Sequence, residues 1–132
     1  MFTGSFIKPK DNSGIKLARV LRVYKRQNKL QVGDVLLVSA RVVRLRKVKH
    51  VITRKKKITK IVKGQKMKAL LVFTSHMLIR NSILVRGNTN SIVIIRKNFF
   101  YELVGSRLRT PIFLEVRKFK LSKLFILAYS II

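Results

Sequence analysis

Along most of this chain, apolar residues recur at every second position or in short continuous runs, rather than with the 3.6-residue period of a helix. Four such runs, LARVLRVY, VLLVSARVV, MKALLVFT and SIVII, cover residues 17–24, 35–43, 67–74 and 91–95. They are rich in Val, Leu and Ile, and turn-forming sequences such as DNSG, VGD and VKG bound them. The pattern predicts a mainly β fold, and several short strands at this spacing predict a small antiparallel β-barrel without open sheet edges.

The pattern changes toward the C-terminus, where period two is lost. Thr110 followed by Pro111 is typical of a helix N-cap and a first helical position. We therefore expect a short helix over about residues 111–117 and a second helical turn over about 119–125. The final run FILAYSII, residues 125–132, is too apolar to remain in water, so we expect it to pack on the barrel or on a neighbouring molecule.

The size and composition of the chain predict one folded domain. The 132 residues suit a single modest core, and 48% of them are hydrophobic, well above what a disordered chain carries. We expect one domain over residues 1–132, with the barrel at about 5–100 and the helical or extended C-terminal segment at about 105–132.

The charge of the chain predicts a polyanionic partner. The formal net charge is +27, from 31 Lys and Arg against 4 Asp and Glu, so the folded chain repels itself unless a polyanion neutralises it. The candidates are nucleic acid and an anionic membrane. The longest nearly uncharged run, residues 69–79, is well short of the roughly 20 residues that cross a bilayer, and period two disfavours an amphipathic helix. We therefore expect nucleic acid and no membrane span.

The sequence contains no motif typical of a catalytic or metal-binding site. The chain has no Cys, and its few acids and histidines are Asp11, Asp34, Glu102, Glu115, His50 and His76. No two carboxylates pair in sequence, neither histidine has a second ligand at metal-binding spacing, and the glycines form no phosphate-binding motif. We therefore predict no enzyme, catalytic residue, metal, cofactor or small-molecule substrate.

A series of ordered landmarks gives a sharper signal. DNSG, VGDVLLVSA, VKGQKMKALLV, RGNTNSIVII and GSRLRTPIFLEVR follow one another, and the chain ends on LAYSII. In this order and spacing they resemble the universal large-subunit ribosomal protein fourteen family, from about residue 7 to the end. The chain departs from the family pattern at Thr110, where the family has glycine, at Arg109, at Gln65, and at Asn81 and Ser82 in place of an Asp-Gly turn.

The resemblance implies a five-stranded β-barrel with short C-terminal helices that serves as a structural constituent of the large ribosomal subunit. It implies binding to large-subunit rRNA at the subunit interface, contact with a neighbouring large-subunit protein, and an intersubunit bridge to small-subunit rRNA. Lys and Arg would neutralise phosphates, while turn amides and short polar side chains would add geometric contacts.

A basic stretch replaces the family's short link between VSA and the VKG turn. Residues 44–61, RLRKVKHVITRKKKITKI, contain no acid but keep apolar residues between the charges. We expect a long basic β-hairpin extension with TRKKK, residues 53–57, at its tip and rRNA as its ligand.

Site residues follow from the resemblance and from this basic stretch. The residues expected to bind rRNA are Asn12, Ser13, Lys16, Arg44, Arg46, Lys47, Lys49, Arg54, Lys55, Lys56, Lys57, Lys60, Lys63, Lys66, Lys68, Arg86, Ser106, Arg107 and Arg109. The residues expected at a protein partner or bridge are Pro111, Glu115, Arg117 and Lys118. Phe99, Phe100 and Tyr101 form an aromatic cluster that suits either a core or base stacking.

Two further questions remain open at the level of sequence. Abundant Ile, Phe, Leu, Lys and Asn with no Trp fit an AT-rich coding genome, and the N-terminus shows no presequence pattern. We expect a mitochondrial ribosome on the matrix side, with a plastid or a bacterial cytoplasm as alternatives. The rival function is an extra-ribosomal, barrel-type protein that binds RNA or another single-stranded nucleic acid.

Overall fold

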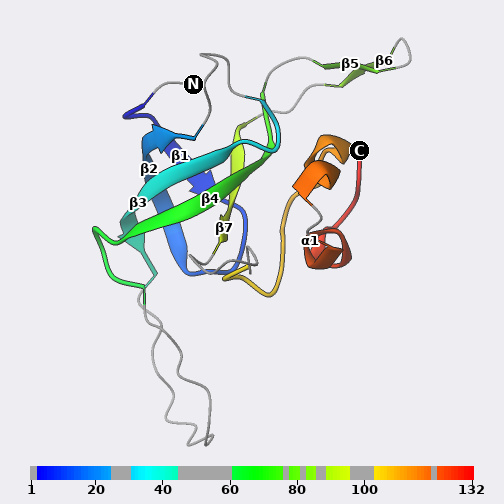
Figure 1. Cartoon of the computed structure of the whole chain (residues 1–132). Coiled ribbons are helices and arrows are strands. Elements are labelled where there is room, and N and C mark those ends of the chain that lie inside the picture. The colour runs from blue at the N-terminus through cyan, green and yellow to red at the C-terminus, as the bar shows by residue number, and fades with distance from the viewer. Residues whose placement is uncertain are drawn as a thin grey trace, which may run out of the picture.

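A computed structural model of the chain describes residues 3–24, 31–44, 61–75, 78–80, 83–85, 89–95, 103–119 and 122–132. Its strands are β1 (Phe6–Pro9), β2 (Ile15–Val23), β3 (Val35–Val43), β4 (Lys66–Phe73), β5 (Leu78–Arg80), β6 (Ile83–Val85) and β7 (Ser91–Ile95). A 3₁₀-helix η1 (Leu114–Phe119) and a short helix α1 (Ser122–Leu127) follow (Figure 1).

Five of these strands close into a barrel in the order β1-β2-β3-β4-β7, which confirms the predicted five-stranded β-barrel. Four of the neighbouring pairs are antiparallel, but β1 and β7 pair in parallel, with Lys8 opposite Ser91. The antiparallel prediction is wrong for this pair for a geometric reason. When an odd number of strands alternates in direction around a closed barrel, the first and last strands must run the same way.

The strand bounds follow the sequence pattern closely. β3 and β7 occupy the predicted residues, and β2 and β4 differ from their predicted ranges by at most two residues at each end. β5 and β6 form a separate antiparallel hairpin, with Leu78 opposite Val85, which lies away from the barrel in Figure 1.

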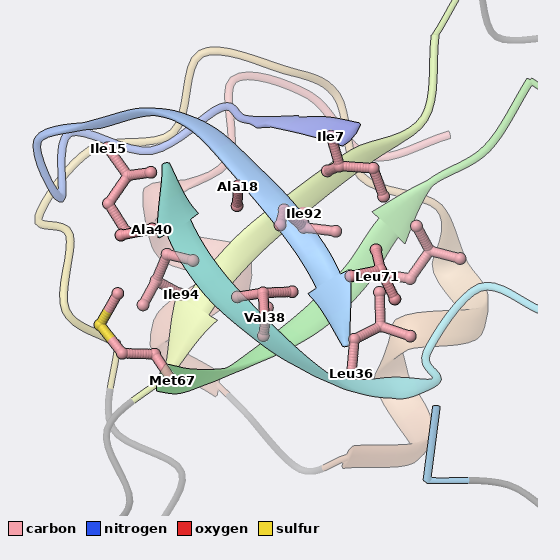
Figure 2. Close-up of a cluster of buried hydrophobic side chains, with 12 residues drawn as sticks. Ile7, Ile15, Ala18, Leu36, Val38, Ala40, Met67, Leu71, Ile92 and Ile94 are labelled. Atoms are coloured by element: carbon pink, nitrogen blue, oxygen red, sulfur yellow. The ribbon is translucent and has the colours of Figure 1, made fainter. Parts of the chain in front are cut away.

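The barrel interior is an aliphatic core built from alternate positions of each strand (Figure 2). Apart from the irregularities in β2, inward positions alternate with outward ones along the strands, and small Ala residues among larger side chains suit the narrow barrel interior. The buried members of this core are Ile7, Ile15, Ala18, Val20, Leu36, Val38, Ala40, Met67, Ala69, Leu71, Ile92 and Ile94.

A second apolar cluster lies on the outside of β4 and β7. Their outward residues meet the C-terminal segment, which lies beside the barrel in Figure 1, and the cluster's buried members are Leu70, Val72, Val93, Ile95, Leu108, Ile112, Val116 and Leu124. Because the inner face of β7 meets the barrel core and its outer face meets this segment, all five of its residues are buried. The continuous apolar run SIVII follows from this double burial.

The first C-terminal helix begins later than predicted. Thr110 and Pro111 precede an extended segment in which Ile112 pairs in parallel with Ile131. The Ile112 N–H donates to the Ser130 carbonyl at 2.9 Å, and the Leu114 N–H donates to the Ile132 carbonyl at 2.9 Å. The Ile112 carbonyl, which would accept an intrahelical hydrogen bond in a helix from residue 111, instead accepts the Ile132 N–H at 2.8 Å. The helical turn therefore begins only at Leu114, and a helix over 111–117 is wrong. The predicted packing of the tail on the barrel is confirmed for Phe125, Leu127 and Ala128, which are half-buried against the second apolar cluster, whereas Ile126 and Tyr129 are exposed.

Some predictions fall on residues that the structure leaves undescribed. The hairpin extension over 44–61 falls almost wholly on residues 45–60, and the aromatic cluster at 99–101 also lies outside the described residues. The division of the chain into a single domain with these parts stays a prediction.

Candidate nucleic-acid interface

A basic hollow opens where the end of β1, the DNSG turn, the end of β3 and the segment before η1 meet. Its volume is about 530 Å³, and its lining comprises Lys8, Pro9, Lys10, Asp11, Asn12, Gly14, Ile15, Lys16, Arg44 and Arg109. Five of these residues are cations, and the single acid, Asp11, is buried. We call this site the basic hollow. Its charge suits an anion such as a backbone phosphate.

Asp11 anchors the DNSG turn to the barrel rather than facing a ligand. Its Oδ2 accepts a hydrogen bond from the backbone N–H of Ile94 on β7 at 2.8 Å. Its Oδ1 accepts the Ser13 N–H at 3.1 Å and the Ser13 hydroxyl at 2.5 Å. Burial raises the pKa of the Asp11 carboxyl, and the bonds from Ser13 and Ile94 oppose that shift. The carboxylate is therefore a structural acceptor that fixes the DNSG turn, which lines the basic hollow, to β7.

Asn12 ties two distant landmarks together. Its Oδ1 accepts the backbone N–H groups of Ser106 at 2.7 Å and Arg107 at 3.1 Å, and its Nδ2 donates to the Ser106 hydroxyl at 2.9 Å. Beside it, the Arg109 N–H donates to the Lys10 carbonyl at 2.9 Å. These bonds hold the GSRLR segment against the DNSG turn, so that Arg109 reaches the same hollow as Lys10.

Gly105 allows this close approach. A Cβ at this position would lie 2.8 Å from Asn12 Oδ1 and 2.9 Å from the Asp11 Cβ. We expect Gly105→Ala to lower the free energy of unfolding by about 1–3 kcal/mol, because the two packed segments must separate. Urea denaturation followed by circular dichroism measures this change. Lys63→Ala, at an exposed turn position, is the control and should change stability by less than about 0.5 kcal/mol. Equal midpoints for the two variants would contradict the packing argument.

The structure brings some of the predicted rRNA-binding residues together. Lys16, Arg44 and Arg109 are exposed cations of the basic hollow, and Asn12 and Ser13 shape its turn. Ser106 and Arg107, both exposed, adjoin it through Asn12.

The other predicted residues that the structure describes do not line the hollow. Lys63 lies in the exposed turn before β4, and Lys66 and Lys68 lie on β4 itself. Pro111 and Glu115 are half-buried and Arg117 is exposed, whereas only the backbone of Lys118 is described. Nine predicted residues lie outside the described residues: Arg46, Lys47, Lys49, Arg54, Lys55, Lys56, Lys57, Lys60 and Arg86.

Sequence reasoning missed two cations of the basic hollow, Lys8 and Lys10. They stand at alternate positions immediately before the DNSG turn, in the run KPKDNSG. The signal available in the sequence was a pair of cations, separated by one residue, directly before the turn.

The described residues bear on metal-ligand clusters and membrane-spanning helices. In the parts of the chain that the structure describes, no group of three His, Asp or Glu side chains gathers as metal ligands would. Within the same residues, no helix has the length and apolar character needed to cross a bilayer.

A closed five-stranded barrel with a basic hollow and a packed C-terminal segment defines a class of small, strongly basic β-barrel proteins. Within this class, the chain belongs to the ribosomal protein L14p/L23e family, whose family model matches residues 1–132. It is also 31% identical to the large ribosomal subunit protein uL14m of Acanthamoeba polyphaga over 115 residues, which cover 84% of this chain and 91% of that protein. The chain is thus a ribosomal protein with a structural role.

Proposed function

We propose that this chain binds large-subunit rRNA, with the basic hollow as a principal contact. The observation that carries the proposal is the convergence of Lys8, Lys10, Lys16, Arg44 and Arg109 on one hollow whose only acid is buried and hydrogen-bonded. Cations on a rigid turn neutralise phosphates at fixed positions, which is how proteins hold the compact shape of folded RNA. This is binding without catalysis.

The C-terminal segment offers a second contact surface. Several large apolar side chains are exposed along η1 and the tail, namely Leu114, Ile126, Tyr129, Ile131 and Ile132, and Ile126 and Tyr129 are 80% and 85% exposed. An exposed apolar ridge on a chain of such high charge suits a protein partner rather than RNA. We propose that this ridge contacts a neighbouring large-subunit protein. The neighbouring residues Pro111, Glu115, Arg117 and Lys118 would then lie at the bridge to small-subunit rRNA.

We also propose that the chain works in a mitochondrial ribosome, on the matrix side. The similarity to uL14m of Acanthamoeba polyphaga supports a ribosomal protein of the mitochondrial type. The amino-acid composition, which fits an AT-rich coding genome, agrees with it. A plastid or bacterial ribosome would share the same fold and contacts.

Sedimentation of an organelle extract tests this function directly. In moderate salt and detergent, the chain should sediment with intact ribosomes. After magnesium is chelated and the subunits separate, it should move with the large subunit and away from a small-subunit marker protein in the same fractions. If the chain stays at the top of the gradient under both conditions, the ribosomal proposal fails and the extra-ribosomal nucleic-acid-binding alternative takes its place.

A further inference from the structure

An exposed aromatic ring lies among cations on the outer face of the barrel, apart from the basic hollow. Tyr24 directly follows β2, where its N–H donates to the Val35 carbonyl at 3.0 Å, and it is 48% exposed. The guanidinium carbon of Arg22 lies 5.8 Å from the centre of the Tyr24 ring, and Lys68 Nζ lies 5.9 Å from it. The backbone bond thus fixes Tyr24 at the end of β2, and about half of the residue stays exposed to a ligand.

Strand register explains why these groups meet. Arg22 pairs with Leu37, and Leu37 pairs with Lys68, so the three side chains form one row across β2, β3 and β4. The neighbouring inward positions, including Leu36 and Ala69, are buried in the barrel core, so this row lies on the outer face.

A second row on the same face repeats the combination of an aromatic ring and cations. Phe6 pairs with Arg19, Arg19 with Ser39, and Ser39 with Lys66. Phe6 is 60% exposed, and Arg19 and Lys66 are exposed as well. Rings interleaved with cations on barrel strands are the arrangement by which proteins hold unpaired nucleotides, since bases stack on the rings and phosphates meet the cations.

Neither a role in the core nor a protein partner suits the exposed Tyr24 ring. A core residue would not be 48% exposed or lie beyond the inward-facing rows. A protein partner is disfavoured because protein interfaces exclude Lys from their centres, whereas Lys68 lies against this ring. The described acid nearest in sequence, Asp34, accepts the Gln31 N–H within its own turn. The charged side chains described on this face include the cations Arg19, Arg22, Lys66 and Lys68, which give it a positive charge.

We propose that the outer face of β2–β4 is a stacking platform for an unpaired RNA base, with Tyr24 as the stacking ring and Arg22 and Lys68 as the phosphate contacts. The platform rests on the proposed function, because it adds to rRNA binding a mode of contact that the basic hollow does not supply. The basic hollow holds the backbone of folded RNA, and the platform captures a base that the fold leaves unpaired.

The test compares two RNAs on the full-length chain by fluorescence anisotropy at about 0.1 M salt. One RNA is a labelled oligouridine of about 12 nucleotides, a length suited to a single-strand site, and the other is a blunt RNA duplex of similar length. Tyr24→Ala should weaken oligouridine binding by about 5- to 150-fold, and Tyr24→Phe should retain it within about twofold. Duplex binding should change by less than about twofold, and the salt dependence should not change because tyrosine carries no charge.

Tyr129→Ala removes an exposed ring from the tail and is the matched control, with no effect expected on either RNA. Thermal melting of each variant verifies that the barrel remains folded. Oligouridine binding that is unchanged by Tyr24→Ala, or weakened only as much as duplex binding, would overturn the platform and leave the proposed function intact. A wild-type chain that binds neither RNA would overturn both.

Discussion

Replacing Phe113 by alanine should lower the free energy of unfolding by about 3–5 kcal/mol, a large part of the roughly 5–15 kcal/mol that stabilises an ordinary domain. Phe113 is fully buried, and its ring stacks on Phe73 with 4.4 Å between the ring centres. Its N–H also donates to the Val72 carbonyl of β4 at 3.3 Å. The side chain therefore fastens the C-terminal segment to the outside of the barrel, and its removal leaves a cavity that β4 cannot fill.

Urea denaturation of the free chain, followed by circular dichroism, measures this loss. Leu114→Ala, at the next residue, is the matched control because its side chain is 43% exposed, and it should cost less than about 1 kcal/mol. A Phe113→Ala cost below about 1 kcal/mol would show that the C-terminal segment contributes little to the stability of the barrel.

Four of the five barrel strands were predictable because each of them carries its own pattern. Period-two alternation locates β2 and β3, and the continuous run SIVII locates β7, since burial on both faces removes the polar positions. β1 was not predicted from the pattern, because the strand has only four residues and two of them are Lys8 and Pro9. Its place depends on long-range pairing with β2 and β7, which no local pattern encodes.

The C-terminal error has a similar cause. Thr110 and Pro111 carry a strong local helix-start signal, but the pairing of Ile112 with Ile131 prevails over it. That pairing joins residues near the two ends of the segment, so local propensity could not predict it.

The candidate site divides in the same way. The sequence landmarks include Asn12, Ser106 and Arg107, yet only the fold shows that one amide side chain joins them across more than ninety residues of sequence. The sequence places its aromatic cluster at residues 99–101, whereas in the described residues the exposed ring with two cations directly beside it is that of Tyr24 on the barrel. Its partner Lys68 comes from another strand, so only the register reveals the group.

Neutralising three exposed cations of the basic hollow should give the largest loss of rRNA affinity. The triple variant Lys16→Gln, Arg44→Gln and Arg109→Gln removes three of the proposed phosphate contacts, each of which should add about 0.7–0.9 to the slope of log affinity against log salt. The slope should therefore fall by about 2–3, and at about 0.1 M salt affinity should drop roughly 100- to 500-fold. The fold should survive, because the three side chains are exposed and their removal reduces self-repulsion.

Filter binding to large-subunit rRNA transcribed in vitro, repeated across a salt series, measures both quantities. The matched control is Arg41→Gln, Arg117→Gln and Lys123→Gln, three exposed cations outside the basic hollow that give the same change in net charge. Because the overall field of the protein then changes equally in both variants, any difference between them reports contacts made at the hollow. If both triples lower the slope by the same amount, the positive charge acts diffusely over the surface and the basic hollow is not a specific rRNA contact.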